Sequence, residues 1–147
     1  MHDLTVKAQR LLELLGLLRP QLFGPAMQRL SALDLSPSHI RVLHLLAQDS
    51  PVPMKQIADQ LCVKPPSVTA LTRHLTATGL VERLAHPEDS RMVLLGLTEA
   101  GHALHQQVHA EQLERMASLL ARLDPAEQAQ LLDLLARALA VPPPTPE

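Results

Sequence analysis

The segment from Pro53 to Thr98 constrains the fold of this chain more than any other part of the sequence. A short stretch with apolar periodicity is followed by a tight three-residue link and by a second helical stretch that ends at Gly79. Two strand-like runs come next, joined by a polar turn. Helix, turn, helix and hairpin in this order predict a helix-turn-helix with a β-hairpin wing, which can present one helix and one loop to DNA grooves.

The second helical stretch, Pro65–Thr78, is predicted to be the reading helix. Val68, Leu71 and Leu75 recur at spacings of three and four and predict the inward face. At about 100° per residue, the opposite face carries short polar groups and a cation that can contact base edges and phosphates. A solvated face of an ordinary helix is the alternative, which the adjoining hairpin disfavours. The side chains predicted to contact DNA in and just before this helix are Lys64, Pro66, Ser67, Thr69, Ala70, Arg73 and His74.

The wing is predicted from two strand candidates, Leu80–Leu84 and Met92–Leu97, and from the turn residues between them. Asp89 and Arg91 in this loop are two residues apart, so an extended segment would point both to one side. The carboxylate could then hold the guanidinium in a fixed pose for a narrow minor groove. The alternative for Asp89 and Arg91 is a surface ion pair without function.

The two ends of the chain are rich in leucine and are predicted to form helices that pair with a second subunit. The first helix is expected to begin near Asp3 or Thr5, and Pro20 and Pro25 are expected to kink or break it. Leucines recur on more than one face, so a single small chain cannot bury them all. Residues 1–34 and 98–141 are therefore predicted to be dimerisation helices, residues 35–97 a winged helix-turn-helix domain, and residues 142–147 a disordered proline-rich tail. The predicted fold class is mainly α with a small β-hairpin wing.

Composition narrows the function class. The net charge is −2, although six cations and five carboxylates give the segment from Leu35 to Leu97 a charge of +1. DNA binding would therefore depend on a few well-placed cations. The single cysteine, Cys62, is expected to be a buried, unreactive thiol in a reducing cytoplasm. The sequence has no secretion-signal pattern and no apolar run long enough to cross a membrane, so no membrane contact is expected. It also has no phosphate loop, nucleophile elbow or HExxH motif, so neither enzymatic activity nor a cofactor is expected.

From Leu35 to Gly101 the sequence resembles the MarR (multiple antibiotic resistance regulator) family of bacterial winged-helix proteins. The resemblance implies a homodimeric transcriptional regulator, expected to be a repressor, that binds a palindromic operator on double-stranded DNA. It also assigns the wing pair to Asp89 and Arg91. The chain has Ser90 where relatives often have a second arginine, and Lys64 gives the reading helix no hydroxyl cap. The matching runs are IADQL (Ile57–Leu61), SVTALTRHL (Ser67–Leu75), GLVER (Gly79–Arg83), PEDSR (Pro87–Arg91) and LTEAG (Leu97–Gly101).

An effector site is also predicted. In relatives a small-molecule effector binds between the dimer region and the winged domain, which here implies Phe23, Met27, His39, Arg41 and Leu43. A small aromatic acid is the family-level expectation, and the shortage of aromatic residues favours a mainly aliphatic pocket.

Metal binding is an alternative that the sequence leaves open. His105 and His109 are four residues apart on a predicted helix and could share a metal ion, with Glu111 and Glu114 nearby. A solvated or interface face is the preferred interpretation of these histidines. A zinc-responsive regulator and a protein-interaction module that does not bind DNA therefore remain the alternative functions.

Overall fold

The computed structural model describes residues 2–141, apart from the side chains of His2 and Met27. The predicted tail at residues 142–147 lies outside the described residues. In chain order the elements are α1 (His2–Phe23), α2 (Ala26–Ala32), α3 (Pro37–Gln48), β1 (Val52–Pro53), α4 (Met54–Leu61), α5 (Pro65–Ala77), β2 (Val81–Ala85), β3 (Val93–Leu97), α6 (Glu99–Leu120) and α7 (Pro125–Ala138). The fold is mainly helical with a small antiparallel sheet, so the predicted fold class is confirmed.

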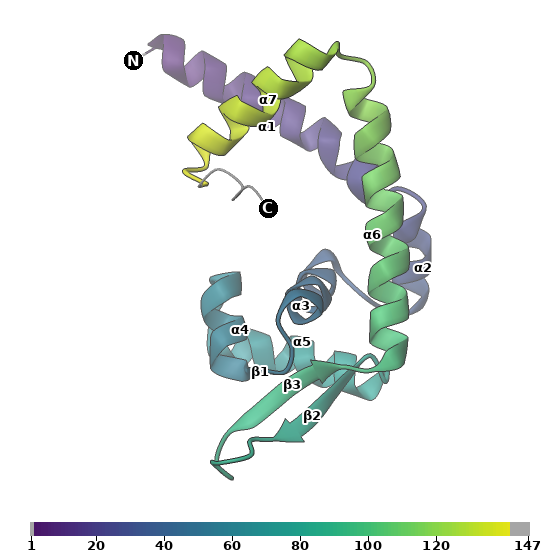
Figure 1. The fold of residues 1–147 in the computed structure, drawn as a ribbon. Helices are drawn as coiled ribbons and strands as arrows, with labels where there is room; N and C mark the ends of the chain where they lie inside the picture. The colour runs from purple at the N-terminus through teal and green to yellow at the C-terminus, as the bar shows by residue number, and fades with distance from the viewer. Residues whose placement is uncertain (1, 142–147) are drawn as a thin grey trace.

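The long helix α6 connects two ends of the molecule (Figure 1). Helices α3, α4 and α5 gather with the sheet at one end, where the β2–β3 hairpin projects as a wing. Helices α1 and α7 lie at the other end. Between residues 2 and 141 no helix combines the length and the apolar character that a membrane crossing needs.

The sheet has a third strand that the sequence did not predict. Its order is β1-β3-β2, and both pairings are antiparallel. Val52 lies opposite Leu95 on one side of β3, and Arg83 lies opposite the same residue on the other. Strand β1 contains only two residues, one of them Pro53, which explains why no pattern in the sequence marked it.

One hydrophobic core holds the winged end together. It contains side chains from α3, α4, α5, the sheet and the first half of α6, so these elements form one packed unit. Dense packing of this kind fixes the direction in which each surface side chain points. Side chains that are entirely or almost entirely buried in it include Leu43, Leu46, Ile57, Leu75, Leu95 and Val108.

Several helix ends carry residue types that commonly occur there: an oxygen-bearing cap residue before a proline, or a glycine after the last turn. Ser36 and Asp124 occupy the cap positions of α3 and α7, and Gly79 stops the chain after α5 with a φ of 75°. The break predicted at Pro25 is confirmed, whereas no break occurs at Pro20. Pro20 lies in the last turn of α1, and the helix continues beyond it to Phe23.

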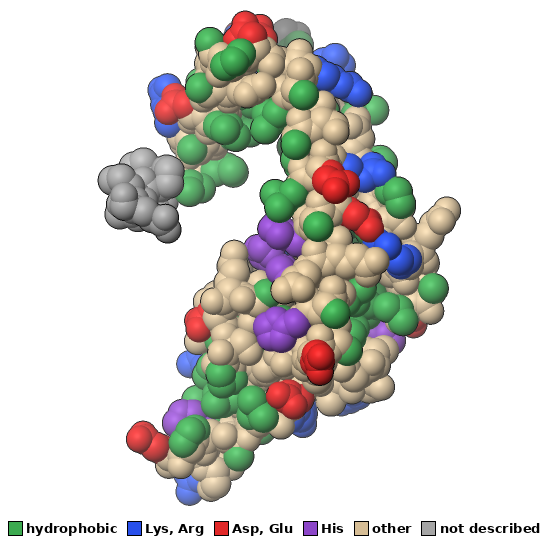
Figure 2. Space-filling view, turned by 45° about the vertical axis from the view of Figure 1, so that its right-hand side comes forward, with side chains coloured by type: hydrophobic (Ala, Val, Ile, Leu, Met, Phe, Trp, Pro, Cys, Tyr) green, Lys and Arg blue, Asp and Glu red, His purple; other side chains and the backbone are tan. Residues whose placement is uncertain are grey.

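The terminal helices leave much of their apolar surface exposed. Helix α7 has no buried residue, and Leu132 is 56% exposed. On α1, Leu12 and Leu17 are 64% and 65% exposed. Hydrophobic side chains line the arch at the top of the space-filling view, over these helices (Figure 2). The predicted helices are present, and much of their apolar surface is not covered within the described part of the single chain.

Candidate DNA-binding surface

Helix α5 is anchored to the core through one face. Val68, Thr72 and Leu75 are buried, with exposures of 1%, 0% and 0%, and Leu71 packs partly against them. The Thr72 hydroxyl donates to the Val68 carbonyl oxygen at 2.8 Å, so this buried polar group is satisfied within its own helix. The inward face predicted from the sequence is confirmed, and Thr72 extends it.

The opposite face of α5 is open to solvent. Pro66, Ser67, Ala70 and Arg73 are all exposed on it, and Lys64 is exposed at the cap position. Within residues 2–141 no hydrogen bond or ion pair engages the Arg73 side chain. Small side chains let this face approach another surface closely, and a guanidinium without a partner can bind a phosphate or a guanine edge.

Two of the predicted contact residues are placed differently. His74 is half-buried: its Nε2 lies 3.3 Å from the Leu33 carbonyl oxygen, and its ring lies 5.0 Å from the His39 ring. It therefore lies at the flank of the exposed face and packs toward α2 and α3, and its contact with DNA stays a prediction. Thr69 is also half-buried, and its hydroxyl donates to the Pro65 carbonyl oxygen at 3.1 Å. Its oxygen can still accept a hydrogen bond, so Thr69 lies at the edge of the face.

The turn between α4 and α5 is tight and well defined. Cys62 ends α4 with a φ of 53°, and the Val63 N–H donates to the Ala58 carbonyl oxygen at 3.1 Å. Cys62 is exposed, so the prediction of a buried thiol is wrong. A residue in the left-handed conformation turns its side chain away from the helix that it ends, which the apolar pattern alone could not indicate.

The tip of the wing is a turn rather than an extended strand. The Met92 N–H donates to the Asp89 carbonyl oxygen at 3.1 Å, which closes the turn. The Asp89 carboxylate accepts the backbone N–H of Arg91 at 2.9 Å, so the predicted ion pair between the two side chains is replaced by a bond to the backbone. His86 supports this turn, since its Nδ1 accepts the N–H groups of Glu88 and Asp89. Arg91 is exposed at the tip, available to a partner.

The predicted effector residues do not share one cavity in the single chain. Leu43 is fully buried in the core, and the side chain of Met27 lies outside the described part of the structure. Phe23 lines a small cavity, His39 a second beside α5, and Arg41 a third beside α6. Effector binding by this set stays a prediction.

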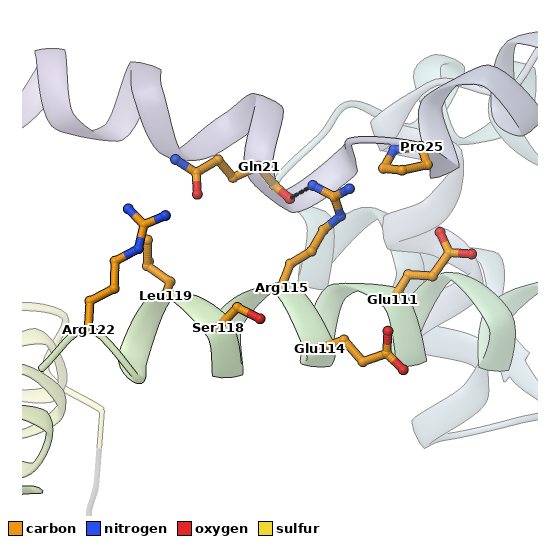
Figure 3. A pocket seen from close by; sticks show the side chains of 8 residues that line it. All are labelled: Gln21, Pro25, Glu111, Glu114, Arg115, Ser118, Leu119 and Arg122. Carbon is orange, nitrogen blue, oxygen red and sulfur yellow. Dashed lines mark hydrogen bonds between the residues drawn. The ribbon is translucent and has the colours of Figure 1, made fainter.

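Another cavity, of about 490 Å³, lies between α6 and the junction of α1 with α2 (Figure 3). Arg115 crosses it and donates to the Gln21 carbonyl oxygen at 3.1 Å. Glu111 forms an ion pair with Arg29 of α2. Glu111 and Glu114 both line this cavity, so neither completes a metal site with the histidines of α6, as the sequence had allowed.

The histidines of α6 instead meet a third histidine from α3. His105 and His109 lie beside His44, and the three form a cluster that sequence reasoning missed. His44 is 61 residues from His105 in the chain, and only the packing of α3 against α6 brings them together.

Comparison with known proteins places this architecture in a family. The MarR family model matches residues 35–93, which extend from the start of α3 to the first residue of β3. The HTH-type transcriptional regulator FarR of Neisseria gonorrhoeae is 34% identical over 96 residues, which are 65% of this chain and 66% of the relative. The uncharacterized HTH-type transcriptional regulator YhbI of Bacillus subtilis is 34% identical over 110 residues, 71% of each chain. The chain belongs to the MarR family.

The likeness to a solved MarR-type structure extends beyond the winged domain. The crystal structure of a MepR–DNA complex from S. aureus is 25% identical, with a TM-score of 0.66. The match covers 90% of this chain and 97% of that chain, so it includes the terminal helices of this MarR-family protein.

Proposed function

We propose that this MarR-family protein is a transcriptional regulator that binds DNA, with α5 in the major groove and the wing at the flanking minor groove. The observation that carries the proposal is the outer face of α5, where Arg73 stands free among small side chains on a helix fixed by the core. Arg91 at the tip of the wing supplies the second cation. A helix and a wing of this geometry suit adjacent grooves of B-form DNA.

The proposed assembly is a homodimer on a palindromic operator. Exposed leucines on α1 and α7 offer an apolar surface that two copies can bury together. Two reading helices related by a two-fold axis would contact half-sites about one helical turn, roughly 34 Å, apart. The MepR complex with DNA is the precedent for a bound protein of this fold.

The proposed regulatory mode is repression that a small-molecule effector modulates. Phe23 lines a cavity of about 270 Å³ with Arg19, Pro20 and Pro37, between the end of α1 and the start of α3. Apolar walls with one guanidinium suit a small organic acid. A ligand there would favour one angle between the terminal helices and the winged domain, which shifts the population of dimers with the correct half-site spacing.

The test is a gel-shift titration of the full chain with the intergenic DNA upstream of its own gene, at several salt concentrations. Arg73→Ala and Arg91→Ala are each expected to weaken binding by about 10- to 100-fold. A residue that contacts a phosphate also lowers the slope of log affinity against log salt by about 1. The control is Arg122→Ala, which removes the same charge at the far end of α6 and is expected to leave affinity within about twofold.

Two results would reject this function. Equal losses in all three variants would mean that net charge alone matters. Binding that ignores salt would favour a protein-interaction module, because phosphate contacts release counterions.

A further inference from the structure

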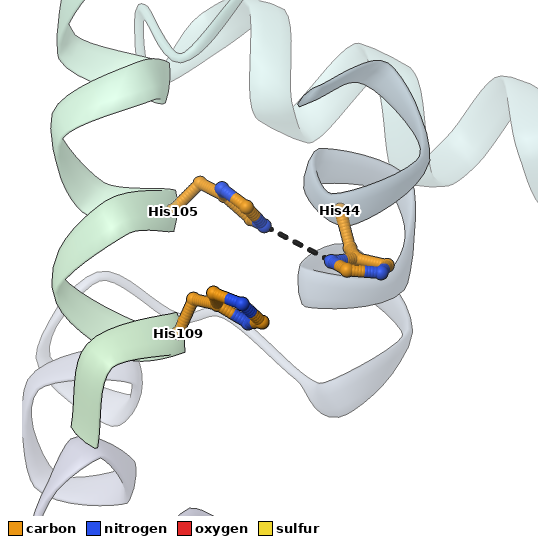
Figure 4. Close-up of side chains that lie close together, drawn as sticks. All are labelled: His44, His105 and His109. Carbon is orange, nitrogen blue, oxygen red and sulfur yellow. Dashed lines mark hydrogen bonds between the residues drawn. The ribbon is translucent and has the colours of Figure 1, made fainter. Parts of the chain in front are cut away.

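Three histidine side chains from two helices surround one point in the structure. His44 projects from α3, and His105 and His109 project from successive turns of α6 (Figure 4). Their ring centroids form a nearly equilateral triangle, with sides of 5.3, 5.5 and 5.7 Å. One nitrogen from each ring lies within 4.8 Å of the others, and His44 Nδ1 lies 3.0 Å from His105 Nε2.

These separations suit a tetrahedral metal ion. Zinc–nitrogen bonds of about 2.0–2.1 Å place two ligand nitrogens roughly 3.3 Å apart. The 3.0 Å pair in the cluster is close to that distance, and all three nitrogens lie within 4.8 Å of one another. Imidazole is a ligand that zinc, copper and nickel favour, whereas magnesium and calcium favour oxygen.

The surroundings prepare the histidines as ligands. His44 Nε2 lies 3.1 Å from Gln48 Nε2, and this amide N–H can donate to the ring and hold it in place. The cluster opens into a cleft of about 440 Å³ that water can enter, where Gln60 and Gln112 are the other polar walls near it.

The cation that lines the cleft is already bonded to another group. Arg41 also lines the cleft, but its guanidinium donates to the Leu61 carbonyl oxygen at 3.4 Å, on the side of α4. None of the residues that line the cleft is a carboxylate, so the donor set is three imidazole nitrogens with one open position for solvent.

We propose that His44, His105 and His109 bind one divalent late transition-metal ion, zinc foremost, with water as the fourth ligand. Because His44 belongs to the winged core and the other two to the helix that leads to α7, the ion would lock α3 to α6. It would then stabilise the packed winged unit near the point where α6 continues toward the terminal helices. The site depends only on this chain's own residues, whereas an effect on operator binding would rest on the proposed function.

The experiment titrates the full, metal-stripped chain with Zn²⁺ against a chromogenic chelator, and with Co²⁺ by visible absorption. We expect one ion per chain and the intense d–d bands of four-coordinate Co²⁺. His44→Ala and the double variant His105→Ala/His109→Ala are expected to lose at least 100-fold in zinc affinity. The matched control is His102→Ala, on the same helix but outside the cluster, which should stay within about twofold.

Folding is checked without metal by circular dichroism and the thermal midpoint. His44 is exposed, so His44→Ala should match the parent chain there, and only the parent should gain several degrees on adding zinc. Loss of binding in His102→Ala with retention in His44→Ala would overturn the proposal, as would zinc affinity no tighter than millimolar. No DNA is present in this titration, so its failure is distinct from a failure of the proposed function.

Discussion

His39 shows how one side chain can tie a helix end to pH. The Ser36 backbone N–H donates to His39 Nδ1 at 3.0 Å, and the Ser36 hydroxyl lies 2.8 Å from the same nitrogen. This reciprocal arrangement caps α3, and the backbone bond needs Nδ1 without a proton. Burial, followed by the repulsion of His74, lowers the pKa of His39, while Asp34 opposes the shift. The cap is therefore intact at neutral pH.

Acid should weaken this cap, and His39→Gln should remove the effect. The pKa of His39 is lower in the folded chain than the unfolded value of 6.5, so its contribution is full above that pH and is lost as pH falls through the folded pKa. Glutamine keeps an acceptor at the same capping position but cannot titrate. Between pH 7.5 and 5.5 the thermal midpoint of the variant should fall about 2–4 °C less than that of the parent. Equal falls, measured by circular dichroism, would contradict the role of His39.

The burial of a side chain was predictable from the sequence where helix periodicity determines it. It was not predictable where a distant neighbour or a turn determines it. Val68 and Leu75 face the core as their spacing required. His74 is half-buried rather than exposed like Arg73, because it packs against the Leu33 carbonyl oxygen and the His39 ring. The side chain of Cys62 is exposed because its backbone is left-handed, and no local residue preference indicated that conformation.

The junction of the wing and α6 is an element-scale contact that permits only glycine. A Cβ added at Gly101 would lie 2.0 Å from the Leu80 carbonyl oxygen and 3.0 Å from its carbon. Thr98 holds the same junction, since its hydroxyl donates to the Gly79 carbonyl oxygen at 2.6 Å and accepts the Gly101 N–H. The start of α6 is thereby fixed directly against the end of the reading helix.

Gly101→Ala should destabilise the protein in spite of a better helix propensity. Alanine gains up to about 1 kcal/mol in a helix, but displacing a backbone carbonyl costs about 1–3 kcal/mol or more, so we expect a net loss of about 2 kcal/mol. Ala103→Gly, at an exposed position one turn along α6, measures the propensity term by itself. Urea unfolding of both variants gives the two values. A Gly101→Ala chain more stable than the parent would show that the junction can widen freely.

Elements were predictable where a cap, a glycine or a long period marked them. Ser36, Asp124 and Gly79 each marked a real helix end. Strand β1 was missed because two residues carry no period, and the proline at position 20 did not indicate that α1 continues to Phe23. The packing between elements had no such signal, which is why the cluster of three histidines was found only in the structure.

At the scale of the whole molecule, many leucine side chains of the terminal helices are exposed to solvent. Leu134 and Leu139 are 50% and 72% exposed on α7, and Leu4 is 73% exposed on α1. Soluble monomers rarely expose contiguous apolar areas of this kind, whereas a two-fold dimer buries each patch against its copy. The amount of leucine was evident from the sequence, but which faces stay uncovered followed only from the fold.

A charge placed on α7 should therefore dissociate the proposed dimer. Burying a leucine side chain contributes about 1.5–3 kcal/mol, and the two-fold axis doubles this, so Leu132→Glu should weaken association by about 10²- to 10⁴-fold. Leu84→Glu is the control, because Leu84 is 38% exposed on β2, in the winged domain and away from the terminal helices. Sedimentation velocity at low micromolar concentration should show a dimer for the parent and for Leu84→Glu, and a folded monomer for Leu132→Glu. That monomer should also lose operator binding, because one reading helix contacts only one half-site. A parent chain that sediments as a stable monomer would contradict both the dimer and the palindromic operator.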